Sequence, residues 1–302
     1  MKNKDCKFIN ISKKNKAHYH IYFNDNNREE EARKNFITKK DKINKIKIIL
    51  DKEISTMKNL FMGCNNIKKI NFIRFKRIDT PNMSKTFCKR PGSKKVNLSK
   101  MKTNNVKNMS YMFDYCYSLK ELDLHNFEVN NVRNMSWMFN GCSSLKKINL
   151  SNFITKNVKN MRHMFSQCSS LKYINLSNFD TNNVRNMQNM FENCSSLKQL
   201  DITNFNTDSI YNMNSMFNGC ESLEKLNLNN FTAYNIGNIS MMFNRCKSLK
   251  ELDLSNFNYN NTNFKNQIVN IFSSDDRFVL STVYIKNIIF TRGLFDGCIK
   301  LK

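Results

Sequence analysis

Cysteine and histidine are the residue types here that could bind a metal or act as nucleophiles, and the chain has ten and four of them. Zinc sites usually contain a CxxC pair, and no such pair occurs. The sequence is repetitive, and most repeats contain one cysteine that lies on an apolar stripe. This position predicts buried free thiols that pack as small hydrophobes. The alternative is a disulfide between adjacent repeats, since Cα atoms about 5 Å apart can be bridged. Seven of these cysteines recur at multiples of 26 residues, with Arg90 in the one gap: Cys64, Cys116, Cys142, Cys168, Cys194, Cys220 and Cys246.

The histidines and the other polar motifs give no reason to expect catalysis. His18 and His20 could share one strand face and bind a metal, but no carboxylate or cysteine accompanies them. His125 occupies a position that is Ser151 in the next repeat, which favours a surface role. No Ser-His-Asp arrangement, HExxH or Walker-type loop appears. We therefore expect a protein that is not an enzyme and that has no cofactor and no metal site.

A strict 26-residue repeat accounts for the spacing of the cysteines and must be read before anything else. Its clearest column is aromatic: Phe61, Phe87, Phe113, Phe139, Phe165, Phe191, Phe217 and Phe243. Methionine recurs four residues earlier in most repeats, and leucine, isoleucine and phenylalanine fill further columns. One polar column is also regular: Asn108, Asn134, Asn160, Asn186, Asn212 and Asn238. We predict that these asparagines satisfy turn backbone between repeats, with ligand binding as the alternative.

Two apolar periodicities occur within each repeat. Leu122 and Leu124 are two apart, which predicts a short strand with both side chains on one side. Met109, Phe113 and Cys116 step by four and three, which predicts one stripe of a short helix. Parallel strands stack at about 4.8 Å, whereas helices need about 8–10 Å. The pattern thus predicts an α/β solenoid of the leucine-rich-repeat type, with a parallel concave sheet and short helices on the convex side.

The repeat unit resembles a known family. The segment SLKELDLSNF (248–257) and the pattern NVxNMxxMFxxC, as in 105–116, are similar to the leucine-rich repeat of BspA-like surface proteins. They also resemble the mycoplasma-type repeat domain of unknown function. The resemblance covers about residues 57–257. It implies a leucine-rich-repeat fold and a surface or adhesion-type protein that binds other proteins.

Three regions are expected along the chain. Residues 1–56 should form an N-terminal cap, with a possible atypical first coil around Ile46. Residues 57–257 should form eight 26-residue leucine-rich repeats. Residues 258–302 should hold irregular C-terminal coils, because the repeat register breaks after Phe257.

The charge of the chain is uneven, which leaves a second functional hypothesis open. The net charge is +25, and residues 57–101 hold 12 basic side chains against Asp79 alone. An intracellular basic scaffold could contact nucleic acid or acidic lipid there. Nucleic acid is the less favoured of these, since no RNA-recognition motif or zinc finger occurs.

The location of the protein is predicted differently by two observations. No run of 18 apolar residues predicts a membrane span. The N-terminus lacks the apolar stretch of a secretory signal, which indicates the cytoplasm. The family resemblance implies the cell surface instead.

The leading hypothesis is a non-enzymatic repeat scaffold that binds a protein partner through the outward side of its strands. This face is polar and mixed in charge, and Tyr173 is its only aromatic residue in the outermost column. Aromatic and long side chains dominate binding surfaces. The predicted contact residues are Lys147, Tyr173, Asn175, Gln199 and Asp201.

Overall fold

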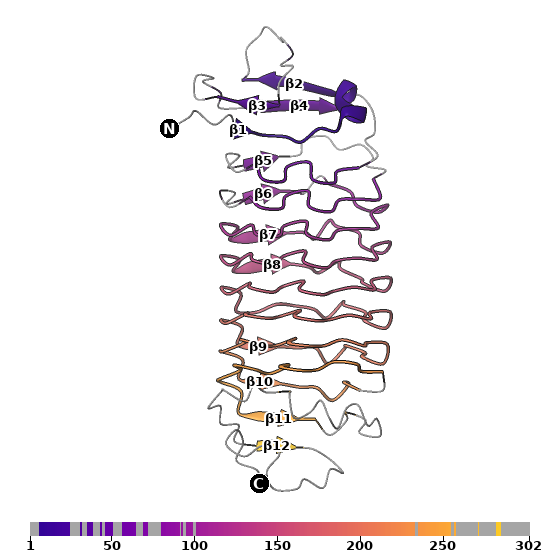
Figure 1. Cartoon of the computed structure of the whole chain (residues 1–302), viewed down its shortest axis with the longest axis vertical. Helices are drawn as coiled ribbons and strands as arrows, with labels where there is room; N and C mark the ends of the chain where they lie inside the picture. Colours follow the sequence, from indigo (N-terminus) through magenta and orange to yellow (C-terminus); the bar gives the residue numbers. More distant parts are fainter. Residues whose placement is uncertain are drawn as a thin grey trace.

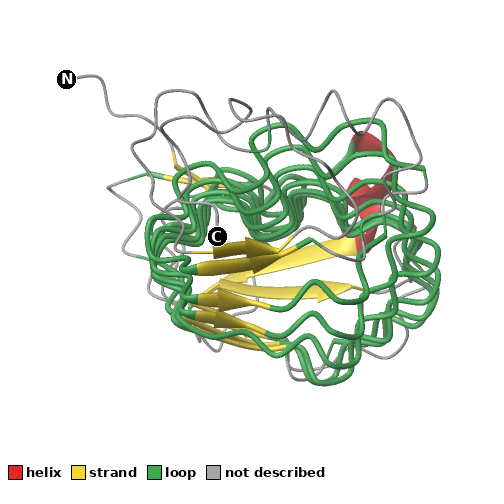
Figure 2. Cartoon of the chain, turned by 90° about the horizontal axis from the view of Figure 1, so that it is seen from below, coloured by secondary structure: helices red, strands yellow, loops and turns green. Residues whose placement is uncertain are grey.

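The structure is a computed structural model that describes residues 6–24, 31, 35–38, 43, 46–50, 56–64, 69–71, 80–90, 92, 95–98, 101–232, 235–254, 257, 271 and 282–284. Each 26-residue repeat forms one rung, and the rungs lie one above another along the longest axis of the molecule (Figure 1). Seen along the stack, the rungs superimpose and most of the strands gather on one side (Figure 2). Residues at the same position of the 26-residue repeat therefore form columns along the axis.

The phenylalanine column is the centre of the core. Phe61 to Phe243 stack in adjacent rungs with ring centroids 5.3–5.9 Å apart and planes within 2–13° of parallel. The columns of Met109 and Cys142 are buried around it, and the described residues of the Leu122 column are buried except at Ile148 and Ile174, which are partly buried. One continuous apolar core thus runs through the stack.

The strands are short and belong to separate two-stranded sheets. The sheets β5–β6, β7–β8, β9–β10 and β11–β12 are parallel, whereas β1–β3 and β2–β4 are antiparallel. The only helix among the described residues is a 3-10 helix, η1. In chain order the elements are β1 (Cys6–Lys7), η1 (Lys13–His18), β2 (Tyr19–Phe23), β3 (Phe36–Ile37), β4 (Ile46–Leu50), β5 (Lys69–Asn71), β6 (Lys95–Asn97), β7 (Glu121–Asp123), β8 (Lys147–Asn149), β9 (Gln199–Leu200), β10 (Lys225–Leu226), β11 (Glu251–Asp253) and β12 (Thr282–Tyr284).

The predicted α/β solenoid, with a concave leucine-rich-repeat sheet and convex helices, is wrong. Where a helix was expected, the Met–Phe segment (109–116 and its equivalents) forms successive turns. Tyr111 and Tyr115 have φ of 57° and 55°, in the left-handed region that interrupts a right-handed helix. The intervening N–H groups of Met112 and Asp114 donate three residues back, to Met109 and Tyr111.

Every second N–H group of the Met–Phe segment, from Met109 to Tyr115, bonds to the next rung. Tyr111 N donates to Ser136 O at 2.9 Å, and Phe113 N donates to Met138 O at 2.9 Å. A helix would use these donors internally and would need about 8–10 Å between neighbours. The rung spacing leaves no such room, so the chain alternates internal and inter-rung hydrogen bonds instead.

The asparagine column (Asn82 to Asn238) links neighbouring rungs through its backbone and holds a turn within each rung through its side chains. Asn82 to Asn238 are joined rung to rung by isolated parallel β-bridges. In each rung the Asn Oδ1 accepts the N–H two residues ahead at 2.9–3.0 Å. The prediction that this column satisfies turn backbone is confirmed, but its placement of these side-chain bonds between repeats is wrong, because each bond lies within one rung.

The N-terminal segment contacts the first rung. Asn10 N donates to Leu60 O at 2.7 Å, and Asn10 Nδ2 donates to the carbonyl oxygens of Asn59 and Met62 at 3.0 and 2.9 Å. Phe8 and Ile9 are buried beside it. The bonds to Leu60 O and Met62 O occupy carbonyl groups that a further rung would otherwise satisfy. The domain boundaries at 56 and 257 stay predictions.

Candidate functional site

The outward strand positions form a polar surface that we call the strand face. Its side chains are all exposed, while the positions between them point into the core. The strand face consists of Glu121, Lys147, Tyr173, Gln199 and Lys225, with Asp123, Asn149, Asn175, Asp201 and Asn227 beside them. It is continuous over five rungs.

Three of the predicted contact residues lie in successive rungs of the strand face. Lys147 in β8 pairs with Glu121 of β7, and Gln199 in β9 pairs with Lys225 of β10. Tyr173 lies in the rung between β8 and β9 and is 60% exposed. The structure therefore brings Lys147, Tyr173 and Gln199 together as one exposed group.

The other two predicted contact residues have a local structural role. Asn175 Oδ1 accepts the N–H of Ser177 at 3.0 Å. Asp201 Oδ1 accepts the N–H and the hydroxyl of Thr203 at 3.1 and 2.7 Å. The side-chain hydrogen bond from Thr203 lowers the pKa of Asp201. Both residues thus hold the turn that follows the strand, and only their remaining polar atoms can meet a partner.

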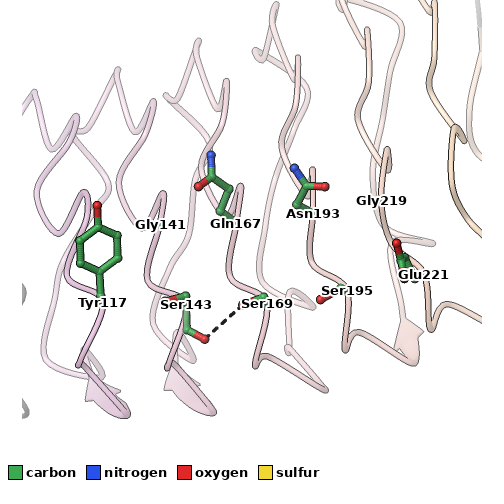
Figure 3. A pocket seen from close by; sticks show the side chains of 9 residues that line it. All are labelled: Tyr117, Gly141, Ser143, Gln167, Ser169, Asn193, Ser195, Gly219 and Glu221. Atoms are coloured by element: carbon green, nitrogen blue, oxygen red, sulfur yellow. Dashed lines mark hydrogen bonds between the residues drawn. The ribbon is translucent and has the colours of Figure 1, made fainter.

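A shallow groove of about 440 Å³ crosses five rungs near the start of the strands (Figure 3). Its lining is hydroxyl and amide groups with one aromatic ring and one acid. Ser169 Oγ donates to Ser143 O at 3.4 Å, and Glu221 pairs with Lys247 Nζ at 3.0 Å. The lining residues are Tyr117, Gly141, Ser143, Gln167, Ser169, Asn193, Ser195, Gly219 and Glu221. The groove could not be predicted from the sequence, because the columns that line it mix residue types.

A second feature missed from the sequence is a stack of rings over three rungs. Tyr111 and Trp137 have centroids 5.6 Å apart, and Trp137 and His163 have centroids 3.7 Å apart. Lys85 Nζ lies 5.0 Å from the Tyr111 ring. Because the faces of these rings pack against one another, the stack stabilises the rungs and does not offer a free aromatic surface to a ligand.

His163 is held neutral in this ring stack. Burial and, to a smaller extent, the positive charge of Arg162 together lower its pKa to about 4. Glu192 Oε2 lies 3.7 Å from His163 Nδ1, yet burial dominates, because the imidazole is 9% exposed. His163 is therefore a packing residue near neutral pH.

The prediction of buried free thiols is confirmed for the repeated cysteines. Each thiol from Cys116 to Cys246 also donates to the phenylalanine carbonyl of the preceding rung, as Cys168 Sγ does to Phe139 O at 3.2 Å. Burial raises the pKa of Cys194 to about 12 and raises that of Cys168 as well. Since the thiolate is the reactive form, these groups should be inert.

We expect Cys142, Cys168, Cys194 and Cys220 to resist alkylation in the native protein, because they are buried and protonated. Peptide mapping by mass spectrometry after iodoacetamide treatment measures this for each cysteine. The variant Ser177→Cys, at an exposed position, should react fast in the same sample. Rapid native labelling of the four column cysteines would contradict the buried column.

Among the described residues, no group of three or more His, Cys, Asp and Glu side chains is placed to hold a metal ion. Within the same part of the chain, no helix is long and apolar enough to cross a membrane.

Comparison with known proteins identifies one family. The family described as "Mycoplasma protein of unknown function, DUF285" matches residues 33–121, 55–174 and 165–281. No curated protein and no solved structure matches the chain. The three overlapping matches span most of the sequence, including every rung from Met57 to Phe257. The chain therefore belongs to the family of Mycoplasma proteins of unknown function, DUF285.

Proposed function

We propose that this chain is a non-enzymatic repeat scaffold that binds a protein partner through the strand face around Lys147, Tyr173 and Gln199. The observation that carries the proposal is Tyr173, a large aromatic side chain that is 60% exposed on a backbone fixed by its rung. Tyrosine is enriched among residues that dominate binding energy. The similarity of the repeat to BspA-like leucine-rich surface proteins supports a role at the cell surface.

Rigidity favours this face over a flexible loop. Ser177 N is held by Asn175 and Thr203 N by Asp201, so the strand ends are ordered before any partner arrives. The conformational entropy of this face is therefore lost when the protein folds and not when a partner binds, which improves affinity. Lys147 and Gln199 flank Tyr173 and extend the contact along the stack.

The test replaces Lys147, Tyr173 and Gln199 with alanine in one variant. All three side chains are exposed, so we expect an unchanged melting temperature and a loss of partner capture by the immobilised protein. The matched control is Lys102→Ala/Glu128→Ala/Ile154→Ala, which removes three exposed side chains of similar size from another column. Proteins captured by wild type and control but not by the strand-face variant define the partner.

Two outcomes would replace the proposal. Equal loss of capture in both variants would show that the strand face has no special role. Alternatively, binding could be abolished only by charge reversal at the basic segment, with a steep dependence on salt. That outcome would favour the scaffold that contacts nucleic acid or acidic lipid through residues 57–101. Within that segment Lys68, Arg74, Lys76 and Arg77 lie outside the described residues.

A further inference from the structure

Four basic side chains stack in register on a surface that the strand face does not include. Lys107, Arg133, Lys159 and Arg185, which we call the basic column, occupy one position in four successive rungs, and all are exposed. In the rungs of Arg133 and Lys159, two turns separate this position from the preceding strand. Adjacent rungs lie about 4.8 Å apart, so the column places one cation per rung in a straight line.

The backbone fixes this alignment. Arg133 N donates to Lys107 O at 2.9 Å, Lys159 N to Arg133 O at 2.9 Å, and Arg185 N to Lys159 O at 3.0 Å. None of the ion pairs between described residues involves these four side chains. Like charges directly opposite each other are destabilising. The basic column is therefore an uncompensated line of positive charge that an anion would stabilise.

Each cation of the basic column has a neutral hydrogen-bond donor next to it in sequence. Asn108, Asn134 and Asn160 use Oδ1 to accept a backbone N–H of their own rung. Their Nδ2 groups have no hydrogen-bond partner among the described residues, and their side chains are half-buried. The rungs of Lys107, Arg133 and Lys159 thus each supply one cation and one amide N–H donor, whereas in the rung of Arg185 the Asn186 Nδ2 group donates to the Tyr211 hydroxyl at 3.4 Å.

We propose that the basic column binds an extended acidic polysaccharide, laid along the stack with one carboxylate or sulfate group per rung. The sugar units of such a chain advance by close to one rung spacing, and their hydroxyl oxygens can accept from the Asn amides. Arg133 and Arg185 suit carboxylates because guanidinium groups bind them through two parallel hydrogen bonds.

Other polyanions fit the basic column less well. Single-stranded nucleic acid is normally held by several aromatic platforms beside the cations, whereas amides flank this column in the rungs of Lys107, Arg133 and Lys159. One exposed aromatic residue, Tyr211, continues the column after Arg185, and its hydroxyl accepts from Asn186 Nδ2 at 3.4 Å. An anionic membrane is a plane and attracts a broad cluster of basic residues, whereas this column is one side chain wide. A single extended chain matches a single line of charge.

The experiment measures binding of oligogalacturonate to the full chain at low salt by calorimetry. We expect the wild type to bind the free acid and not the methyl-esterified oligomer, which has the same sugars without the charge. The variant Lys107→Gln/Arg133→Gln/Lys159→Gln/Arg185→Gln should lose about tenfold or more in affinity. Its melting temperature should not fall, because like-charge repulsion is removed.

A second stacked column of four exposed lysines provides the matched control. The variant Lys120→Gln/Lys146→Gln/Lys172→Gln/Lys198→Gln makes the same change in net charge at another position of the same stack. We expect this control to retain wild-type affinity within about threefold. Equal losses in the two variants would overturn the proposal, since they would indicate a diffuse effect of net charge.

Two further results would also overturn the proposal. One is absence of oligogalacturonate binding by the wild type. The other is tighter, column-dependent binding of oligo(dT) or of phosphatidylserine vesicles, which would make nucleic acid or membrane the ligand. If the fourfold variant fails to fold, Arg133→Gln/Lys159→Gln replaces it and should weaken binding by about threefold or more.

Discussion

Replacing Phe165 with alanine is expected to destabilise the protein by about 3–5 kcal/mol, the range for truncating a fully buried phenylalanine. Phe165 is 0% exposed and stacks on Phe139 and Phe191 at 5.3 and 5.7 Å. Its loss removes ring contacts with two rungs at once and leaves a cavity in the centre of the stack. Urea denaturation followed by circular dichroism measures the effect.

The control for this change is Tyr173→Ala in the same rung, because Tyr173 is 60% exposed. It should alter the free energy of unfolding by no more than about 0.5 kcal/mol. Similar losses in the two variants would mean that the inward and outward faces of the rungs are wrongly assigned. Because each rung contacts its neighbours alone, the Phe165 variant should also unfold less cooperatively than wild type.

Gly141→Ala is the second large effect that we expect, at about 2–4 kcal/mol. Gly141 has φ +68°, where a side chain costs roughly 1–2 kcal/mol. In addition, a Cβ at this position would lie 2.7 Å from Cδ1 of Tyr115 in the preceding rung. Thermal and urea unfolding measure the loss, and the overpacking part should be about 1–2 kcal/mol.

Two matched variants separate the conformational cost from the clash. Gly63 has φ +67°, and a Cβ on this residue would have no atom within 4 Å, so Gly63→Ala should lose only the conformational part. Adding Tyr115→Ala to Gly141→Ala should remove the clash, and the two changes should therefore be less than additive. Equal losses for Gly63→Ala and Gly141→Ala would show that the Tyr115 ring moves aside freely.

Which side chains are buried could be predicted from the sequence alone. A strict repeat gives equivalent residues equivalent surroundings, so a column that is apolar in every repeat must face the core. Met109, Phe113 and Leu122 are buried, while Glu121 and Asp123 are exposed. This part of the prediction required only the period and the residue type.

The helix prediction failed because spacings of three and four also suit successive turns. Met109, Phe113 and Cys116 are buried without a helix, since left-handed residues at Tyr111 and Tyr115 redirect the chain between them. A sequence signal for this existed in the position before each cysteine. In four of the seven repeats with a column cysteine that position holds a type that favours positive φ, namely Gly63, Gly141, Asn193 and Gly219.

The candidate site was predicted only in part, because exposure follows from residue type but contacts between rungs do not. Tyr173 is exposed as its column indicated. The turn role of Asp201 recurs along its column, where each Asp or Asn accepts the N–H two residues ahead, and this repeated residue type was a signal in the sequence. The stack of Trp137 on His163 joins unlike residues and leaves no repeated pattern that a single sequence can show.

The uniform rung has a consequence for inheritance. Since every rung meets its neighbours through the same backbone atoms, a gene that gains or loses 78 base pairs, three per residue of the 26-residue unit, adds or removes one whole rung. The cross-section and the remaining core contacts stay the same, and only the reach of the molecule changes. The Phe243 N–H donates to Ile271 O, three residues beyond the regular partner position, so the bond between two rungs also forms across a small insertion. Length can thus vary between relatives without a new fold.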